Sequence, residues 1–169
     1  IISVTMSHSR VSGVRGDDCN YTLVEDCDIA FNGAGLPSVD NSGMNGNGIT
    51  WLGNTDYVTV RNCRISQCFD MGASTQCASS GVPQQAIDAL YEGNIIDSCC
   101  GGLSVAGTSL SEPEQAHVMS GIARNNIITN SGKGWAGFVN NAHYGNAFSL
   151  AETETGSSTF IIEDNLVDT

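Results

Sequence analysis

The sequence has few basic residues: six Lys and Arg stand against 18 Asp and Glu in 169 residues, giving a formal net charge of −12. A surface this acidic repels phosphate groups, so nucleic acid and anionic membrane surfaces are excluded as partners. Long hydrophobic runs are also missing, and no segment is long enough to cross a bilayer as a helix. We therefore expect no membrane insertion.

What the sequence does contain is a repeated motif, clearest in Tyr57–Gly72, YVTVRNCRISQCFDMG. Around the anchor Ile65, an apolar residue lies five positions before, and small or polar residues lie two before and three after. Strand, corner and strand follow one another, with Gly, Asn, Ser and Asp at the bends and no room for a helix. The pattern returns at the anchors Val11, Ile29, Ile95, Ile127 and Leu166. A constant motif at unequal spacing predicts one coil per repeat, with insertions of variable length.

The coil pattern ϕ-x-x-N-x-I-x-x-N resembles that of right-handed parallel β-helices of the pectin-lyase-like superfamily, over nearly the whole chain. The resemblance implies an all-β right-handed parallel β-helix (solenoid) of about six coils, with loop insertions on one side. We expect two inward columns: Val24/Val60/Leu90/Ile122/Ile161 and Ile29/Ile65/Ile95/Ile127/Leu166. Residues 1–169 then form a single domain. Because neither terminus reads as a polar cap, we expect this domain to be a segment of a longer β-helix, flanked by further coils or domains.

The aligned motifs also place charged residues and cysteines in columns. Opposite charges fall on adjacent coils in three predicted sets: Glu25–Arg61, Glu92–Arg124–Glu163 and Arg10–Asp28–Arg64. Cross-strand pairs of this kind contribute about 0.2–1 kcal/mol each, so a structural role explains most of the arginines. Cys27 and Cys63 share one column, and Cys68 lies in another. Coils lie about 4.8 Å apart, so a disulfide between stacked cysteines stays open.

Insertions are predicted at 36–45, 73–84, 108–115 and 138–145, where they would wall a groove. Asp70 and Asp88 flank the second insertion and are the candidate acid and base of a hydrolase, with His143 as a third catalytic candidate. We expect substrate-binding roles for Tyr144, Trp135 and Lys133. The alternatives are ordinary ones: a turn cap for Asp70, a solvated strand residue for Asp88, and a solvent-facing turn histidine for His143.

The resemblance also implies activity on carbohydrate. β-Helix lyases typically use Lys or Arg as base and often bind Ca²⁺, whereas β-helix hydrolases use paired carboxylates. With one lysine and most arginines explained, the sequence favours a secreted glycoside hydrolase, extracellular or periplasmic, acting on a polysaccharide or glycan without a cofactor. A Ca²⁺-dependent lyase and a non-enzymatic adhesin or tailspike module remain open. The polygalacturonases do not fit, because Asn54-Thr55-Asp56-Tyr57 lacks their glycine and no Gly-His-Gly follows.

Overall fold

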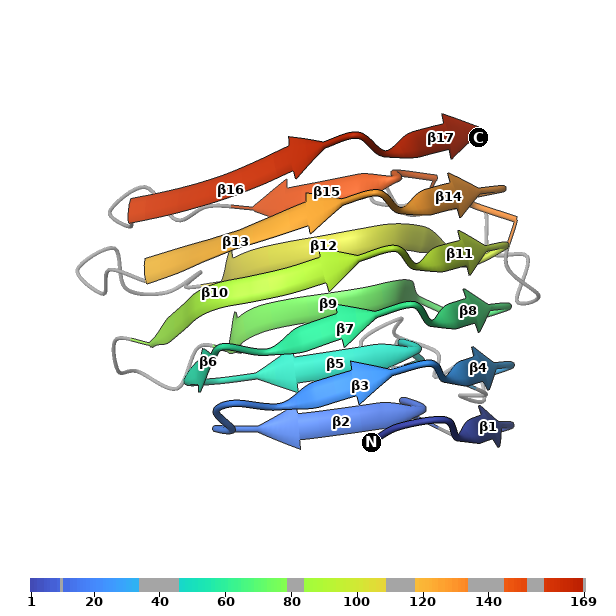
Figure 1. The fold of residues 1–169 in the computed structure, drawn as a ribbon, viewed down its shortest axis with the longest axis horizontal. Helices are drawn as coiled ribbons and strands as arrows, with labels where there is room; N and C mark the ends of the chain where they lie inside the picture. Colours follow the sequence, from blue (N-terminus) through green and yellow to red (C-terminus); the bar gives the residue numbers. More distant parts are fainter. Residues whose placement is uncertain are drawn as a thin grey trace, which may run out of the picture.

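The computed structural model describes residues 1–9, 11–33, 46–78, 84–108, 118–133, 145–151 and 157–168. Within these residues the chain forms strands and no helix, and every strand pairing is parallel. The strands make three sheets, here called A, B and C, which the chain visits repeatedly in that order (Figure 1). The expected all-β parallel architecture is confirmed as a β-helix-like solenoid.

Each sheet takes one strand from successive passes of the chain. Sheet A contains β3 (Leu23–Glu25), β7 (Thr59–Arg61), β10 (Gln85–Glu92), β13 (Val118–Arg124) and β16 (Ser157–Glu163), with β6 (Thr55–Asp56) also paired to β10. Sheet B contains β1 (Thr5–Ser7), β4 (Asp28–Ala30), β8 (Arg64–Ser66), β11 (Ile95–Asp97), β14 (Ile127–Thr129) and β17 (Leu166–Asp168). Sheet C contains β2 (Val14–Asp17), β5 (Ile49–Leu52), β9 (Met71–Ala78), β12 (Gly101–Thr108) and β15 (Phe148–Ala151).

The bend from sheet A to sheet B is made by one residue with a left-handed backbone. This position has a φ between 52° and 65° in the residues Asp26, Asn62, Gly93, Asn125 and Asp164. Asp, Asn and Gly tolerate this conformation best, which is why the repeat carries them at this bend. The prediction that such residues fill the corners is confirmed.

The inward column of sheet A differs by one residue from the predicted column in its later strands. Val24 pairs with Val60 as expected, but Val60 then pairs with Tyr91, and Tyr91 with Ala123. All four residues in this column are buried. The predicted core residues at these later positions, Leu90, Ile122 and Ile161, lie on the outer face. Tyr91 is accommodated inside because its hydroxyl group hydrogen-bonds to the hydroxyl of Thr75.

Sheet B shows the same shift. Ile29 and Ile65 pair as predicted, and the column continues through Ile96 and Ile128, both buried. The predicted Ile95, Ile127 and Leu166 are instead exposed by 41%, 38% and 60%. At the first motif Met6, not Val11, pairs with Ile29. A slip of one residue turns every side chain of a strand to the opposite face, so these corrections decide which residues are available to a ligand.

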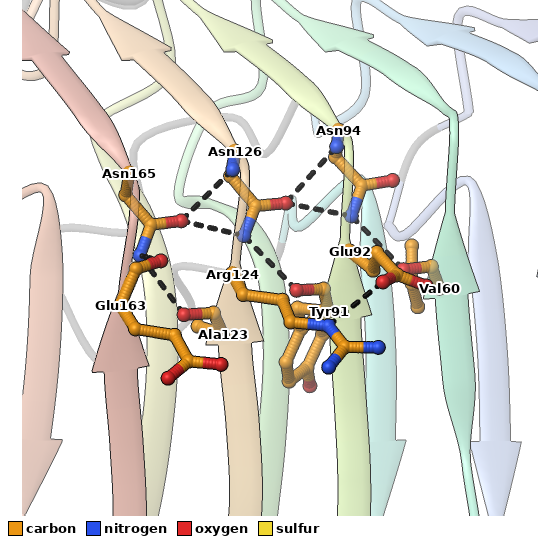
Figure 2. Close-up of polar contacts among 9 residues, drawn as sticks. All are labelled: Val60, Tyr91, Glu92, Asn94, Ala123, Arg124, Asn126, Glu163 and Asn165. Carbon is orange, nitrogen blue, oxygen red and sulfur yellow. Dashed lines mark hydrogen bonds and ion pairs between the residues drawn. The ribbon is translucent and has the colours of Figure 1, made fainter.

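The corrected register creates a buried ladder of asparagines at the bend between sheets A and B (Figure 2). The Oδ1 of Asn126 accepts hydrogen bonds from the backbone N and the Nδ2 of Asn94, both at 3.0 Å. Asn126 in turn donates from its Nδ2 to the Oδ1 of Asn165 at 2.9 Å and to the carbonyl of Tyr91 at 3.0 Å. The ladder satisfies backbone groups at the bend, which would otherwise be buried without partners.

Among the described residues the cysteines form no disulfide. All of them except Cys19 are buried in the interior. The thiols of Cys27 and Cys63 interact, as do those of Cys68 and Cys99. Cys99 stands in the same column as Cys68 because Asp97 pairs with Ser66 two residues earlier.

Two of the four predicted insertions begin inside strands. Residues 73–78 belong to β9 and residue 108 ends β12, so the second and third insertions are shorter than predicted. The second predicted range begins too early because small residues such as Ala73 and Ser74 are also typical of loops. Ala73 and Ser74 are strand residues, and both are buried. The remainder of these insertions, and most of the other two, lies outside the described residues.

Candidate functional site

The outer face of sheet A carries a groove of about 310 Å³ over β10, β13 and β16. Its middle row is apolar and consists of Leu90, Ile122 and Ile161, which pair in register on adjacent strands. Beside it runs a polar row formed by Asp88, Ser120 and Thr159. The same shift that removed Leu90, Ile122 and Ile161 from the core therefore makes them the floor of a surface groove.

Asp88 is held at the groove by a local irregularity of β10. The pairing of β10 with β13 shifts between Ala86 and Ala89, and Asp88 has a φ of 56°. Its backbone N donates to the Oγ of Ser120 at 2.9 Å, and its Oδ1 lies 3.4 Å from the same hydroxyl. β-Bulges of this kind re-aim a side chain and are frequent next to active sites. Asp88, predicted from the sequence as a catalytic carboxylate, thus lines the groove.

The groove is bordered on its other side by a row of alternating charges. Glu25, Arg61, Glu92, Arg124 and Glu163 pair in register across five strands, which joins two of the predicted charge sets into one column. Arg61 lies 2.5 Å from Glu25, and Arg124 lies 2.7 Å from Glu92. The hydrogen bond that Arg61 donates to Glu25, together with the negative charge of Glu25, raises the pKa of Arg61. The predicted order Glu92, Arg124, Glu163 is confirmed (Figure 2).

Arg124 is also part of the groove wall, which the sequence did not indicate. We had expected a purely structural role because its charge is compensated by its neighbours. The third predicted set is confirmed only for Asp28 and Arg64, which pair in register. The residue beside Asp28 on the other side is Thr5, and Arg10 lies outside the described residues.

The polar row of the groove continues past Asp88 into two stacked tyrosines. The backbone N of Tyr21 donates to the carbonyl of Asp56, and the N of Tyr57 donates to the carbonyl of Ile87. These bonds place Tyr21 beside Tyr57, and Tyr57 beside Asp88, on successive passes. All three share a φ of 56°. The two rings are nearly parallel, at 7°, with their centroids 4.9 Å apart.

The structure does not bring Asp70 and Asp88 together. Asp70 lies at the bend before β9. Its backbone N donates a hydrogen bond to the carbonyl of Gly46 at 3.4 Å, and its own carbonyl accepts one from the backbone N of Gly101 at 3.2 Å. The eight residues of β9 then carry the chain along sheet C before it enters β10, and Asp88 is only the fourth residue of that strand. Asp70 therefore lies at the bend between sheets B and C, whereas Asp88 lies in sheet A, and the long strand β9 separates them along the chain.

Of the remaining predicted site residues, the structure describes only Lys133. Lys133 is exposed in the turn after β14, where its Nζ donates to the Oδ1 of Asn130 at 3.2 Å. That turn follows sheet B, away from the outer face of sheet A. His143, Tyr144 and Trp135 lie outside the described residues.

The sequence analysis missed most of the residues that line the groove. Ser120 and Thr159 line the groove, and the tyrosine pair lies beside it. Each of these residues stands three positions before the inward residue of its coil in sheet A, as Ser120 does before Ala123 and Tyr57 before Val60. This column is visible in the sequence only once the register is correct. The described residues contain no cluster of three or more His, Cys, Asp or Glu suited to a metal ion. Among the same residues, no helix is long and apolar enough to span a membrane.

Comparison with known proteins gives a family for this chain. A search of curated proteins and a search of solved structures both returned no match. A protein-family model described as "Disaggregatase related" matches residues 43–169, which include β10, β13, β16 and the whole groove between them. Because this match covers most of the chain, the protein belongs to the disaggregatase-related family.

Proposed function

We propose that the chain is a carbohydrate-binding β-helix domain and that the groove on the outer face of sheet A holds a polysaccharide. The observation that carries this proposal is the layout of the groove: an apolar row with a hydroxyl and carboxylate row on one side and charged side chains on the other. A sugar ring has apolar C–H faces and hydroxyl groups around its rim. The apolar floor suits the former, and the polar rows offer hydrogen bonds to the latter.

The family description supports the same proposal. It relates the chain to a disaggregatase, a name that refers to the separation of aggregated material. The chemistry of the groove makes polysaccharide the component of such material that this domain would recognise. We further propose a location outside the cytoplasm, extracellular or periplasmic, and binding that needs no metal ion or other cofactor.

We also propose the finer architecture that the sequence pattern implies. We infer a stack of about six coils with a right-handed winding of the pectin-lyase-like kind, in keeping with the parallel strand order. In this arrangement the strands of sheet A lie about 4.8 Å apart, so a ligand that crosses them meets the same rows on each coil. A polymer with a regular repeat is suited to such a surface.

Glycoside hydrolysis is the second candidate function, because Asp88 lines the groove. Hydrolysis requires two carboxyl groups, about 5 Å apart in a retaining enzyme and about 6.5–9.5 Å apart in an inverting one. Asp88 is the only carboxylate among the described residues that line the groove, so binding remains the primary proposal. A hydrolase would lose its turnover in Asp88→Asn while still retaining the polysaccharide.

Binding can be measured by affinity electrophoresis in gels containing xylan, galactomannan, alginate or polygalacturonate. The test variant is Ile161→Ser, which alters the groove floor at a side chain that is already 46% exposed. The matched control is Ile127→Ser, on the outer face of sheet B and 38% exposed. We expect retardation of the wild-type protein by at least one polysaccharide, weakened by Ile161→Ser and unchanged by Ile127→Ser. Equal retardation of the two variants, or no retardation in any gel, would contradict the proposal.

A further inference from the structure

We propose that the ring of Tyr57 forms the end of the polysaccharide site, where one sugar unit stacks on it directly above Asp88. This inference rests on the proposed function and adds Tyr57 to the residues that bind the polysaccharide. Tyr57 is not among the residues that line the groove, but it occupies the adjacent position in the same polar row. Tyr57 is 46% exposed.

The stacking geometry leaves one face of Tyr57 available. Tyr21 covers the other face, with a centroid distance of 4.9 Å and an angle of 7° between the rings. On the opposite side the next member of the column is Asp88, whose side chain is too short to cover an aromatic ring. One face of the Tyr57 ring is therefore backed by a second ring, and we infer that the other face is open on the side of Asp88.

The backbone fixes the direction of both tyrosine side chains. Tyr21 and Tyr57 each have a φ of 56°, a left-handed conformation that recurs at other bends of the solenoid, including those at His8 and Phe31. The tyrosine bend differs from these in its next member, Asp88, which lines the groove.

The charges around Tyr57 favour binding of a neutral sugar ring over binding of an acidic substituent. The arginines beside the row, Arg61 and Arg124, are already paired with Glu25 and Glu92. Among the described residues, no unpaired cation therefore stands near Tyr57 to attract a carboxylate or sulfate group. An aromatic face next to a carboxylate suits the C–H face of a sugar whose hydroxyl groups donate to Asp88. Tyr57 acts in this account as a binding residue, with Tyr21 as its support.

A second stacked pair in the chain provides a matched control. His8 and Phe31 stack at 5.2 Å and 12°, and both have a left-handed backbone, with φ values of 61° and 53°. This pair lies at the bend after sheet B, and Phe31 is 43% exposed. A purely structural role for stacked rings predicts that Phe31→Ala and Tyr57→Ala behave alike. A role in binding predicts that they differ.

The experiment compares Tyr57→Ala, Tyr57→Trp and Phe31→Ala in the same four gels, with urea unfolding as a check on folding. We expect Tyr57→Ala to weaken binding roughly three- to ten-fold, Tyr57→Trp to retain it, and Phe31→Ala to leave it unchanged. Wild-type affinity in a folded Tyr57→Ala, combined with a loss in Ile161→Ser, would overturn this inference and leave the proposed function intact. Wild-type affinity in Ile161→Ser, or no binding of the parent to any of the four polysaccharides, would overturn both.

Discussion

At the scale of single residues, the pKa values of the cysteine thiols reflect their burial in the interior of the solenoid. Burial raises the pKa of Cys63 and of Cys77 to about 11. Burial, with a further contribution from the charge of Asp70, raises the pKa of Cys100 to about 12. The thiolate is the reactive form, so these thiols are both inaccessible and protonated at neutral pH.

We predict that Ellman's reagent at about pH 8 modifies Cys19 rapidly and the six buried cysteines slowly, because only Cys19 is partly exposed. In denaturant all seven thiols should react. Raising the pH toward 10 should do little to speed the reaction of Cys63, Cys77 and Cys100, because their pKa values lie above this range. Fewer than seven thiols in denaturant without reductant would show that stacked pairs such as Cys27 and Cys63 form disulfides.

At the scale of single elements, the asparagine ladder is the contact most sensitive to substitution. Truncating Asn126 would leave the carbonyl of Tyr91 and the backbone N of Asn94 without these partners in a buried bend. An unsatisfied buried polar group costs about 1–3 kcal/mol. We therefore expect Asn126→Ala to lower the free energy of unfolding by about 3 kcal/mol in urea titrations.

Asn165→Ala is the control for the ladder, because Asn165 is only partly buried and water can replace some of its bonds. It should cost clearly less than Asn126→Ala. Equal costs for the two variants, or a cost below about 1 kcal/mol for Asn126→Ala, would contradict the structural role assigned to the ladder.

The charge row makes a separate prediction about Arg124. Its ion pair with Glu92 is at the surface, with 39% of the arginine side chain exposed, so Arg124→Ala should cost no more than about 1 kcal/mol of stability. Because Arg124 also lines the groove, the same variant should weaken polysaccharide binding. Arg61→Ala is the control for binding, since Arg61 belongs to the row but not to the groove lining. Equal polysaccharide affinity in the two variants would show that Arg124 has only a structural role.

The strands themselves show what the sequence can and cannot predict. The repeat was readable because the strand-corner-strand pattern forces Asn, Asp and Gly into the bends. The register of the strands could not be read from the sequence, because two adjacent apolar residues could each serve as the anchor in three of the repeats. These pairs are Ile95–Ile96, Ile127–Ile128 and Leu166–Val167. Tertiary packing decides between them: Tyr91 enters the core beside Thr75, and this places Ile96 inside and Ile95 outside. A pattern of single residues contains no information about such a partner.

For the whole molecule, the groove residues could be predicted only in part, because the sequence does not give the register of the strands. Asp88 was found because it follows an insertion and precedes a strand, and the structure places it in the groove. Ser120, Thr159 and Tyr57 were not found, because their common face appears only when the strands are stacked in register. Asp70 was expected nearby because β9 was taken for a loop, whereas it is an eight-residue strand.

The net charge of the molecule predicts how binding depends on salt. With a formal charge of −12 and paired arginines on the binding face, attraction to an acidic polymer contributes little. We expect the affinity for a bound polysaccharide to stay within about two-fold between low salt and about 0.5 M NaCl, as measured by calorimetry. A steep loss with salt would show that charge, and not the apolar floor and its hydrogen bonds, holds the ligand.

The most direct test of the central claim is to map where a polysaccharide binds. Amide chemical shifts of the ¹⁵N-labelled protein would be followed during titration with oligosaccharides from the polysaccharide that it binds best. We predict that the largest changes fall on the outer residues of β10, β13 and β16, including Asp88, Ser120 and Ile161, and extend to Tyr57. Changes concentrated on sheet B or sheet C, with these residues unaffected, would contradict the account.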